Sequence, residues 1–130
     1  MRFDKDGKDY YGIIQDGSIT QLDGDLFGSY TISNKKYALE EVKLLVPCKP
    51  TKVVAVGLNY RDHAKEMGED LPDNPKLFMK PSTALLDPEQ EIILPAMSKR
   101  VDYEAEIAVV IKKTTKNITV NDAKDYILGY

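Results

Sequence analysis

Two glutamates, Glu104 and Glu106, lie in an otherwise mainly apolar stretch at residues 101–111. Residues 105–111 are rich in β-branched side chains, which predicts a strand buried on both faces. Side chains alternate along a strand, so both glutamates would point to the same side. Two like charges there repel each other and resist desolvation, and a divalent cation between them would remove both costs. Such carboxylates suit Mg²⁺, Mn²⁺ or Ca²⁺. The alternative is that both face solvent where the strand begins, because Glu-x-Glu is a common pattern.

A second pair of residues that could take part in catalysis is Glu66 and His63, the single histidine. Asp62 is expected to cap a short helix holding residues 63–67, and Gly68 is expected to end it. Residues three apart are neighbours on one helical face, so the carboxylate would orient the imidazole and stabilise its charged form. That arrangement makes a general base. The alternative is a weak ion pair on the protein surface.

Lys80 is the third candidate, at the end of a predicted strand over residues 77–80. The following Pro81 holds residue 80 in an extended conformation. The preceding stretch, residues 68–75, is polar and contains two prolines, which predicts a loop, and its place after His63 suits a mobile lid. Lys80 would either bind an anionic group of a substrate or reach into solvent.

The elements that must position these residues are mostly short strands. Residues 1–46 predict a β-meander, because Asp6-Gly7 and Asp16-Gly17 are tight-turn dipeptides between alternating segments. The tyrosines of this part are expected to be packing residues rather than catalytic ones: Tyr10, Tyr11, Tyr30 and Tyr37. Prolines at 47 and 50 mark a junction.

Beyond the junction, the apolar run at residues 53–58 predicts a strand buried on both faces. Further short strands are expected over residues 82–86 and 91–95. Residues 119–122 resemble a capping box with Asp122 in place of Glu, so a helix is expected over residues 123–128, ending at Gly129.

Composition excludes several classes of function. A length of 130 residues allows one domain with a real core, and the net charge of −3 without a basic patch argues against a nucleic-acid surface. The single cysteine, Cys48, excludes an intrachain disulfide and indicates a reducing, cytoplasmic setting. The charged start does not resemble a signal peptide, and no apolar run reaches the roughly 20 residues of a membrane span.

Four motifs in order resemble the fumarylacetoacetate hydrolase family, and most closely its acylpyruvase and oxaloacetate decarboxylase branch. They are Val56-Gly57-Leu58-Asn59-Tyr60-Arg61-Asp62-His63-Ala64-Lys65-Glu66-Met67, then Leu77-Phe78-Met79-Lys80-Pro81-Ser82-Thr83-Ala84, then Asp102-Tyr103-Glu104-Ala105-Glu106-Ile107-Ala108-Val109-Val110, and Asp125-Tyr126-Ile127-Leu128-Gly129-Tyr130.

The resemblance implies a fold that is mainly β with short helices (α+β). It is the family's mixed β-sandwich roll, incomplete here, with a small N-terminal β-rich domain at residues 1–50 and the first part of the catalytic domain at residues 51–130. It also implies that Glu104 and Glu106 are two of three carboxylates that bind Mg²⁺ or Mn²⁺. His63 and Glu66 would be the dyad that activates water, and Lys80 would lie at the pocket.

The implied activity is metal-assisted cleavage of a carbon–carbon bond in a 2-oxo or 1,3-dicarbonyl acid, as in acylpyruvate hydrolysis or oxaloacetate decarboxylation. Isomerisation of a 2-hydroxy-dienedioate on the same fold is an alternative, as is a non-catalytic fragment or half of a split enzyme. The family's third metal ligand, an aspartate, would follow Tyr130, so two carboxylates alone should bind metal weakly. The expected partners are the small-molecule acid and a second copy in a homodimer, or a complementary C-terminal half, with no nucleic acid and no membrane.

Overall fold

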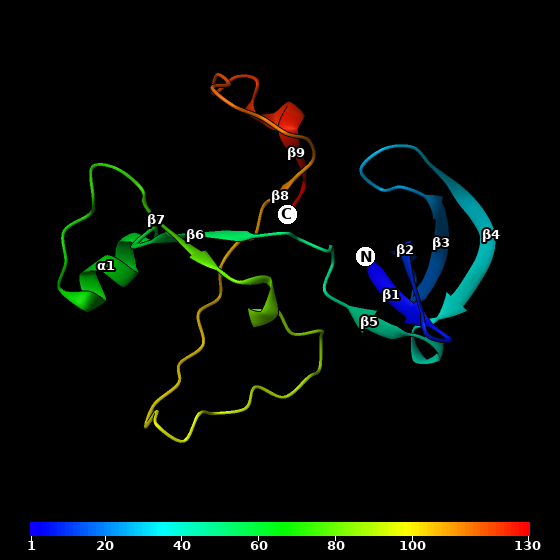
Figure 1. The fold of residues 1–130 in the computed structure, drawn as a ribbon, viewed down its shortest axis with the longest axis horizontal. Coiled ribbons are helices and arrows are strands. Elements are labelled where there is room, and N and C mark those ends of the chain that lie inside the picture. The colour runs from blue at the N-terminus through cyan, green and yellow to red at the C-terminus, as the bar shows by residue number, and fades with distance from the viewer. The chain divides into compact units, whose positions relative to one another are not determined.

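The computed structural model describes all residues, 1–130, and the chain forms two compact units (Figure 1). The first unit combines Met1–Cys48 with Asp87–Tyr130. The second unit is Lys49–Leu86.

An antiparallel five-stranded sheet, drawn in blue to teal in Figure 1, forms the N-terminal part of the first unit. Its strands are β1 (Arg2–Lys5), β2 (Lys8–Gln15), β3 (Ser18–Gly24), β4 (Tyr30–Ala38) and β5 (Lys43–Leu45), with a 3-10 turn at Leu39–Glu41. The spatial order is β4-β3-β2-β1-β5, so β5 returns to pair with β1. The β-meander predicted for residues 1–46 is confirmed for β1 to β4, whereas β5 joins the opposite edge of the sheet.

The two Asp-Gly dipeptides form the first two hairpin turns, as predicted. Asp6 and Gly7 have φ values of 54° and 78°, and Asp16 and Gly17 have 48° and 74°. Positive φ at both central residues is the geometry of a type I′ turn, whose twist matches that of the flanking strands. The turns fix the register, because Lys5 lies opposite Lys8 and Gln15 lies opposite Ser18.

The core of this sheet is small and aromatic. Phe3 and Ile19 have no exposed surface. The Phe3 ring lies 5.7 Å from the Tyr10 ring and 5.6 Å from the Tyr37 ring, measured between centroids. The Tyr37 hydroxyl donates a hydrogen bond of 3.0 Å to Oε1 of the buried Gln21. Tyr10 and Tyr37 are therefore packing residues, as the sequence predicted, but the same prediction for Tyr30 was wrong, since Tyr30 is 49% exposed.

The second unit is a β-hairpin with one helix in its connection. β6 (Val53–Gly57) pairs antiparallel with β7 (Lys76–Lys80), and α1 (Arg61–Met67) lies between them in the chain. Both predicted strands form, but burial on both faces was wrong, since Val54 is 53% exposed. A two-stranded ribbon has no further strands to cover its faces. A 3-10 turn, Ser82–Ala84, replaces the strand predicted over residues 82–86.

The remainder of the first unit, residues 87–130, contains little regular structure. β8 (Val110–Ile111) pairs with β9 (Ile127–Gly129), and a 3-10 turn, Ala123–Tyr126, stands where the longer helix was predicted. The Asp122 N–H donates to Thr119 Oγ1 at 3.3 Å, as in the predicted capping box. The N-cap residue of the turn is nevertheless Asp122, which makes no side-chain cap. No strand forms over residues 91–95.

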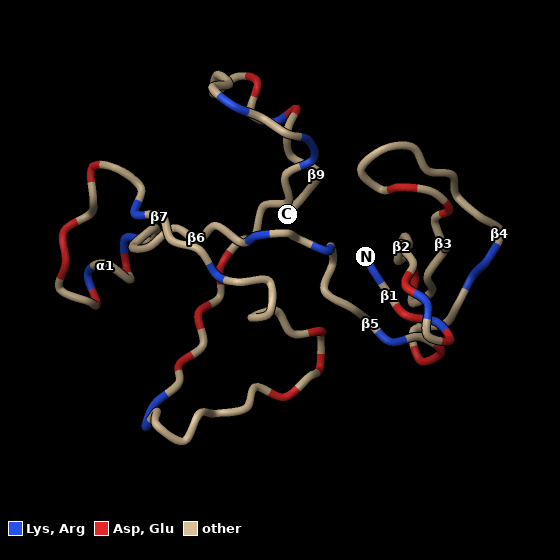
Figure 2. Tube along the Cα trace, in the orientation of Figure 1, with Lys and Arg blue, Asp and Glu red and all other residues tan.

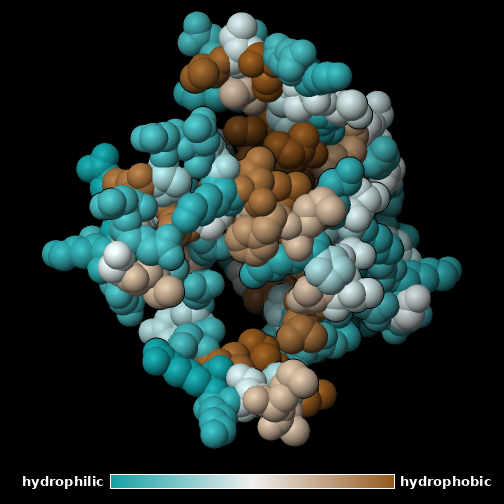
Figure 3. Space-filling view, turned by 60° about the vertical axis from the view of Figure 1, so that its left-hand side comes forward, coloured by the Kyte–Doolittle hydropathy of each residue, from teal (hydrophilic) through white to brown (hydrophobic).

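Apolar side chains reach the surface in many places, as brown patches in Figure 3 illustrate. The most exposed apolar side chains lie in the part of the chain from β7 onward, where for example Met79 is 71%, Ile93 88% and Val120 90% exposed. Figure 2 shows acidic and basic residues interspersed along the chain, with no concentration of positive charge. None of the helices has the length and apolar character needed to cross a membrane.

Candidate active site

Helix α1 presents the candidate base. The helix begins after Tyr60, which makes no side-chain cap, so the cap predicted at Asp62 was wrong. It ends at Gly68 as predicted, where a left-handed conformation with φ 68° lets the Gly68 N–H reach the carbonyls of Ala64 and Lys65. The buried Ala64 is the helix residue that packs inward. His63 and Glu66 thus sit on a short, well-terminated helix.

The two side chains of this pair face each other. His63 Nδ1 lies 3.9 Å from Glu66 Oε2, and the side chains are 39% and 79% exposed. This separation is longer than a hydrogen bond but allows an ion pair when the imidazole is protonated. The helix therefore brings together the two residues that the sequence paired, at the accessible surface where a reactant can approach.

One ion pair joins the two ends of the loop after α1. Lys76 Nζ at the beginning of β7 lies 3.1 Å from Glu69 Oε2, and both side chains are about half exposed. Such an exposed ion pair contributes about 0–1 kcal/mol, so it opens easily. Residues 68–75 form the loop that the sequence predicted, and their role as a lid remains a prediction.

Lys80 ends β7 in the same unit as the dyad. It lies opposite Val53 in the hairpin, and its side chain is exposed. Its Nζ lies 6.0 Å from the centroid of the Phe78 ring, at the limit of a cation–π contact. A strand end followed by a proline fixes the backbone of Lys80 while leaving the ammonium group accessible.

Glu104 and Glu106 are both exposed, in a segment where residues 101–109 form no strand. The strand predicted over residues 101–111 was therefore wrong except at its end, Val110–Ile111. The physical reason is that a strand forms only where another strand pairs with it, and β9 pairs only with that end.

Carboxylate oxygens such as those of the two glutamates are ligands that hard divalent cations prefer, but two carboxylates do not make a complete site. No group of three or more His, Cys, Asp or Glu side chains is placed to hold a metal ion. Mg²⁺ keeps several waters when one or two carboxylates bind it, so two carboxylates suit part of such a site.

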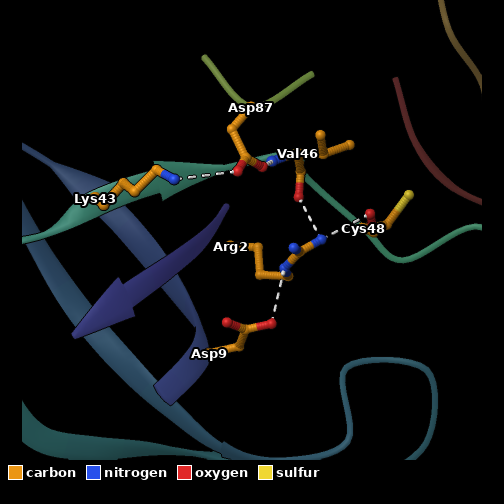
Figure 4. Close-up of polar contacts among 6 residues, drawn as sticks. All are labelled: Arg2, Asp9, Lys43, Val46, Cys48 and Asp87. Carbon is orange, nitrogen blue, oxygen red and sulfur yellow. Dashed lines mark hydrogen bonds and ion pairs between the residues drawn. The ribbon is translucent and has the colours of Figure 1, made fainter. Parts of the chain in front are cut away.

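Sequence reasoning missed a polar network around Arg2, Asp87 and the end of β5 (Figure 4). Its hydrogen bonds join residues far apart in the sequence: Arg2 is 44 residues from Val46, and Val46 is 41 residues from Asp87. No local spacing signals such a network, because it depends on where the chain returns after the second unit.

Comparison with known proteins defines the class. Residues 52–130 match the profile of the fumarylacetoacetate (FAA) hydrolase C-terminal domain, and residues 1–47 match that of the Rv2993c-like N-terminal domain. The chain therefore belongs to the fumarylacetoacetate hydrolase family, and two of the relatives described below have the names of enzymes.

Two similar proteins show the extent of the match in sequence. A protein of Archaeoglobus fulgidus is 49% identical over 121 residues, covering 92% of this chain and 46% of its own length. Oxaloacetate tautomerase Fahd2a, mitochondrial, of Rattus norvegicus is 45% identical over 91 residues, covering 69% of this chain and 29% of its own.

Among solved structures, 5-carboxymethyl-2-hydroxymuconate delta-isomerase from Mycobacterium smegmatis superposes with a TM-score of 0.85 at 32% identity. The match covers 99% of this chain and 51% of that enzyme. The fold is thus that of the family, mainly β with short helices and incomplete. The matches cover 46%, 29% and 51% of the lengths of these three relatives, so the chain spans about half of their length or less.

Proposed function

We propose that this chain supplies part of the active site of a divalent-metal-dependent enzyme that cleaves a carbon–carbon bond in a 2-oxo or 1,3-dicarbonyl acid. The observation that carries the proposal is the facing of His63 and Glu66 at 3.9 Å on α1, inside the segment that matches the family. Lys80, in the same unit, supports it as a cation for an acidic substrate.

In hydrolysis, His63 would act as the general base. Its imidazole would take a proton from water as the water oxygen attacks the carbonyl carbon next to the bond that breaks. Glu66 would orient the ring and stabilise the imidazolium that forms. The electron pair of the broken carbon–carbon bond would pass to the neighbouring keto group as an enolate, which would then take the proton from the His63 imidazolium. Lys80 would bind the substrate carboxylate.

Glu104 and Glu106 would be the carboxylates that hold Mg²⁺ or Mn²⁺, and the bound ion would supply positive charge to the substrate's keto and carboxylate oxygens. For decarboxylation of oxaloacetate no water attack is needed, so the dyad would matter less.

The names of two relatives, an oxaloacetate tautomerase and a delta-isomerase, favour a second candidate. In this case His63 would move a proton within a 2-oxo acid or a 2-hydroxy-dienedioate, and no carbon–carbon bond would break. The two candidates share the acidic substrate and the base but differ in whether water is consumed.

We also propose the organisation of the complete protein. Residues 1–50 would form an accessory domain and residues 51–130 the beginning of the catalytic domain. The site would be completed by a segment corresponding to the rest of the relatives' length, in one chain or as a second polypeptide, and the protein would be a homodimer in the cytoplasm.

The test is an assay with oxaloacetate and acetylpyruvate in Mg²⁺ or Mn²⁺, on this chain alone and with the completing segment. General-base catalysis contributes about 100-fold or more, so His63→Ala should slow acetylpyruvate hydrolysis by about that factor and spare oxaloacetate decarboxylation. Lys65→Ala, on the same helix, is the matched control. An unchanged hydrolysis rate in His63→Ala would refute the role of the dyad.

Enol–keto interconversion of oxaloacetate without loss of CO₂ would establish the second candidate instead. No turnover of any 2-oxo acid, even with the completing segment, would leave a binding or structural role.

The metal ligands are tested by binding. Glu104→Gln/Glu106→Gln should weaken Mn²⁺ binding at least about tenfold, because two charged ligands are removed. Binding is measured from the decrease of the electron paramagnetic resonance signal of free Mn²⁺. Glu91→Gln, an exposed carboxylate in the same part of the chain, is the matched control. Equal affinity in the double variant would exclude this pair as ligands.

A further inference from the structure

Two side chains hold the point where the chain leaves the first unit. The Arg2 guanidinium donates from Nη1 to the Val46 carbonyl at 2.9 Å and to the Cys48 carbonyl at 3.0 Å. Asp87 Oδ1 accepts a hydrogen bond of 2.9 Å from the Val46 N–H. Val46 is thus held from both sides by charged groups, as Figure 4 shows, and we call Arg2 and Asp87 together the Val46 clamp.

The clamp is built from partly buried charges with partners of opposite sign. The Arg2 side chain is 12% exposed and its Nε lies 3.7 Å from Asp9 Oδ2. The Asp87 side chain is 21% exposed and its Oδ2 lies 3.5 Å from Lys43 Nζ. Hydrogen bonds to charged groups are stronger than neutral ones, and low exposure strengthens them further.

The Val46 clamp lies where the chain leaves the first unit and where it returns to it. The chain leaves the first unit after Cys48 and returns to it at Asp87. The two ends of the second unit, which contains His63, Glu66 and Lys80, are therefore held at one place. Holding the two ends together restricts the conformations open to the segment between them.

We propose that Asp87 is a positioning residue for the dyad, acting with Arg2 through the two ends of the second unit. The catalytic consequence rests on the function proposed above, whereas the clamp itself does not. A reacting group carried on a loosely held unit spends less time in its productive position, so loosening one end should lower turnover without changing the reacting groups.

The first measurement is amide hydrogen exchange. In Asp87→Ala the Val46 N–H loses its charged acceptor, and we expect its exchange to accelerate about 10–100-fold, the range for a hydrogen bond to a charged group. Exchange at Phe3 and Ile19, in the core of the sheet, should not change. Asp87→Asn keeps an oxygen acceptor and should restore most of the protection. Glu89→Ala, which removes an exposed carboxylate two residues away, is the matched control.

The second measurement is steady-state kinetics of the complete protein. Asp87→Ala should lower kcat about tenfold, because small misplacements of reacting groups far from a substitution reduce rates by up to about 100-fold. The pH dependence of kcat and the affinity for Mn²⁺ should stay unchanged, since the dyad and the metal ligands are intact. Asp87→Asn should recover most of the lost kcat.

The outcomes separate this inference from the proposed function. Unchanged Val46 exchange in Asp87→Ala, or faster exchange with unchanged kcat, would overturn it. If the wild-type protein turns over no 2-oxo acid, the proposed function fails. The clamp is then tested by the rate of tryptic cleavage after the exposed Lys52. Faster cleavage in Asp87→Ala than in Glu89→Ala would support the clamp, and equal cleavage would overturn it.

Discussion

Replacing Gly12 by alanine tests how tightly the N-terminal sheet is packed. A Cβ atom at this position would lie 2.5 Å from Ile19 Cγ2, 2.9 Å from Phe3 Cε1 and 3.0 Å from the Thr20 carbonyl oxygen. Ile19 and Phe3 have no exposed surface, so neither has open space into which it can move. The φ angle of Gly12 is not in the left-handed region, so the effect is steric and not conformational.

The expected magnitude follows from these contacts. Overpacking a tight core costs about 1–3 kcal/mol, and two contacts below 3 Å place Gly12→Ala in the upper half of this range. For a chain of 130 residues, between the small and large domains for which this is known, each kcal/mol lowers Tm by roughly 3–5 °C, so a decrease of about 6 °C or more is expected.

Urea unfolding followed by tyrosine fluorescence is the assay, since the chain has no tryptophan. Gly129→Ala is the matched control, because a Cβ there meets nothing within 4 Å. Adding Ile19→Ala should relieve the clash, so the double variant should lose less free energy of unfolding than the two single variants added together. If Gly12→Ala destabilises no more than Gly129→Ala, the close packing of Phe3 and Ile19 on β2 is refuted.

Three further predictions concern stability. Burial lowers the pKa of the Met1 ammonium below 8.0, so the folded state binds fewer protons than the unfolded state between that lowered pKa and pH 8. The free energy of unfolding should therefore rise with pH through this window. N-terminal acetylation should abolish this contribution to the rise, and urea titrations at several pH values measure it. Tyr37→Phe removes the hydrogen bond to the buried Gln21 and should cost about 1 kcal/mol in the same assay. Gly68→Ala places a Cβ at φ 68° and should cost about 1 kcal/mol, with Gly68→Asn costing less, as read from the protection of α1 amides.

Each of these has a distinct contrary result. A pH dependence that survives acetylation would assign it to other groups. A stable Tyr37→Phe variant would mean that water replaces the lost hydroxyl at Gln21. Protection in Gly68→Ala equal to that of the wild type would show that the helix end does not need the left-handed conformation.

The sequence alone determined those features that depend on neighbouring residues. Asp6-Gly7 and Asp16-Gly17 form the predicted turns because few other residues adopt positive φ, and Gly68 ends the helix for the same reason. The pairing of His63 with Glu66 follows from helical spacing. The family was evident from four ordered motifs, which need no knowledge of packing.

Only the tertiary structure decided features that depend on distant partners. Residues 101–109 have the composition of a buried strand, yet they form none, because a strand requires another strand beside it. Val46 is clamped by Arg2 and Asp87, residues that have no local relation to it. Composition and spacing report local conformation, whereas pairing, burial and long-range hydrogen bonds depend on which segments the folded chain brings together.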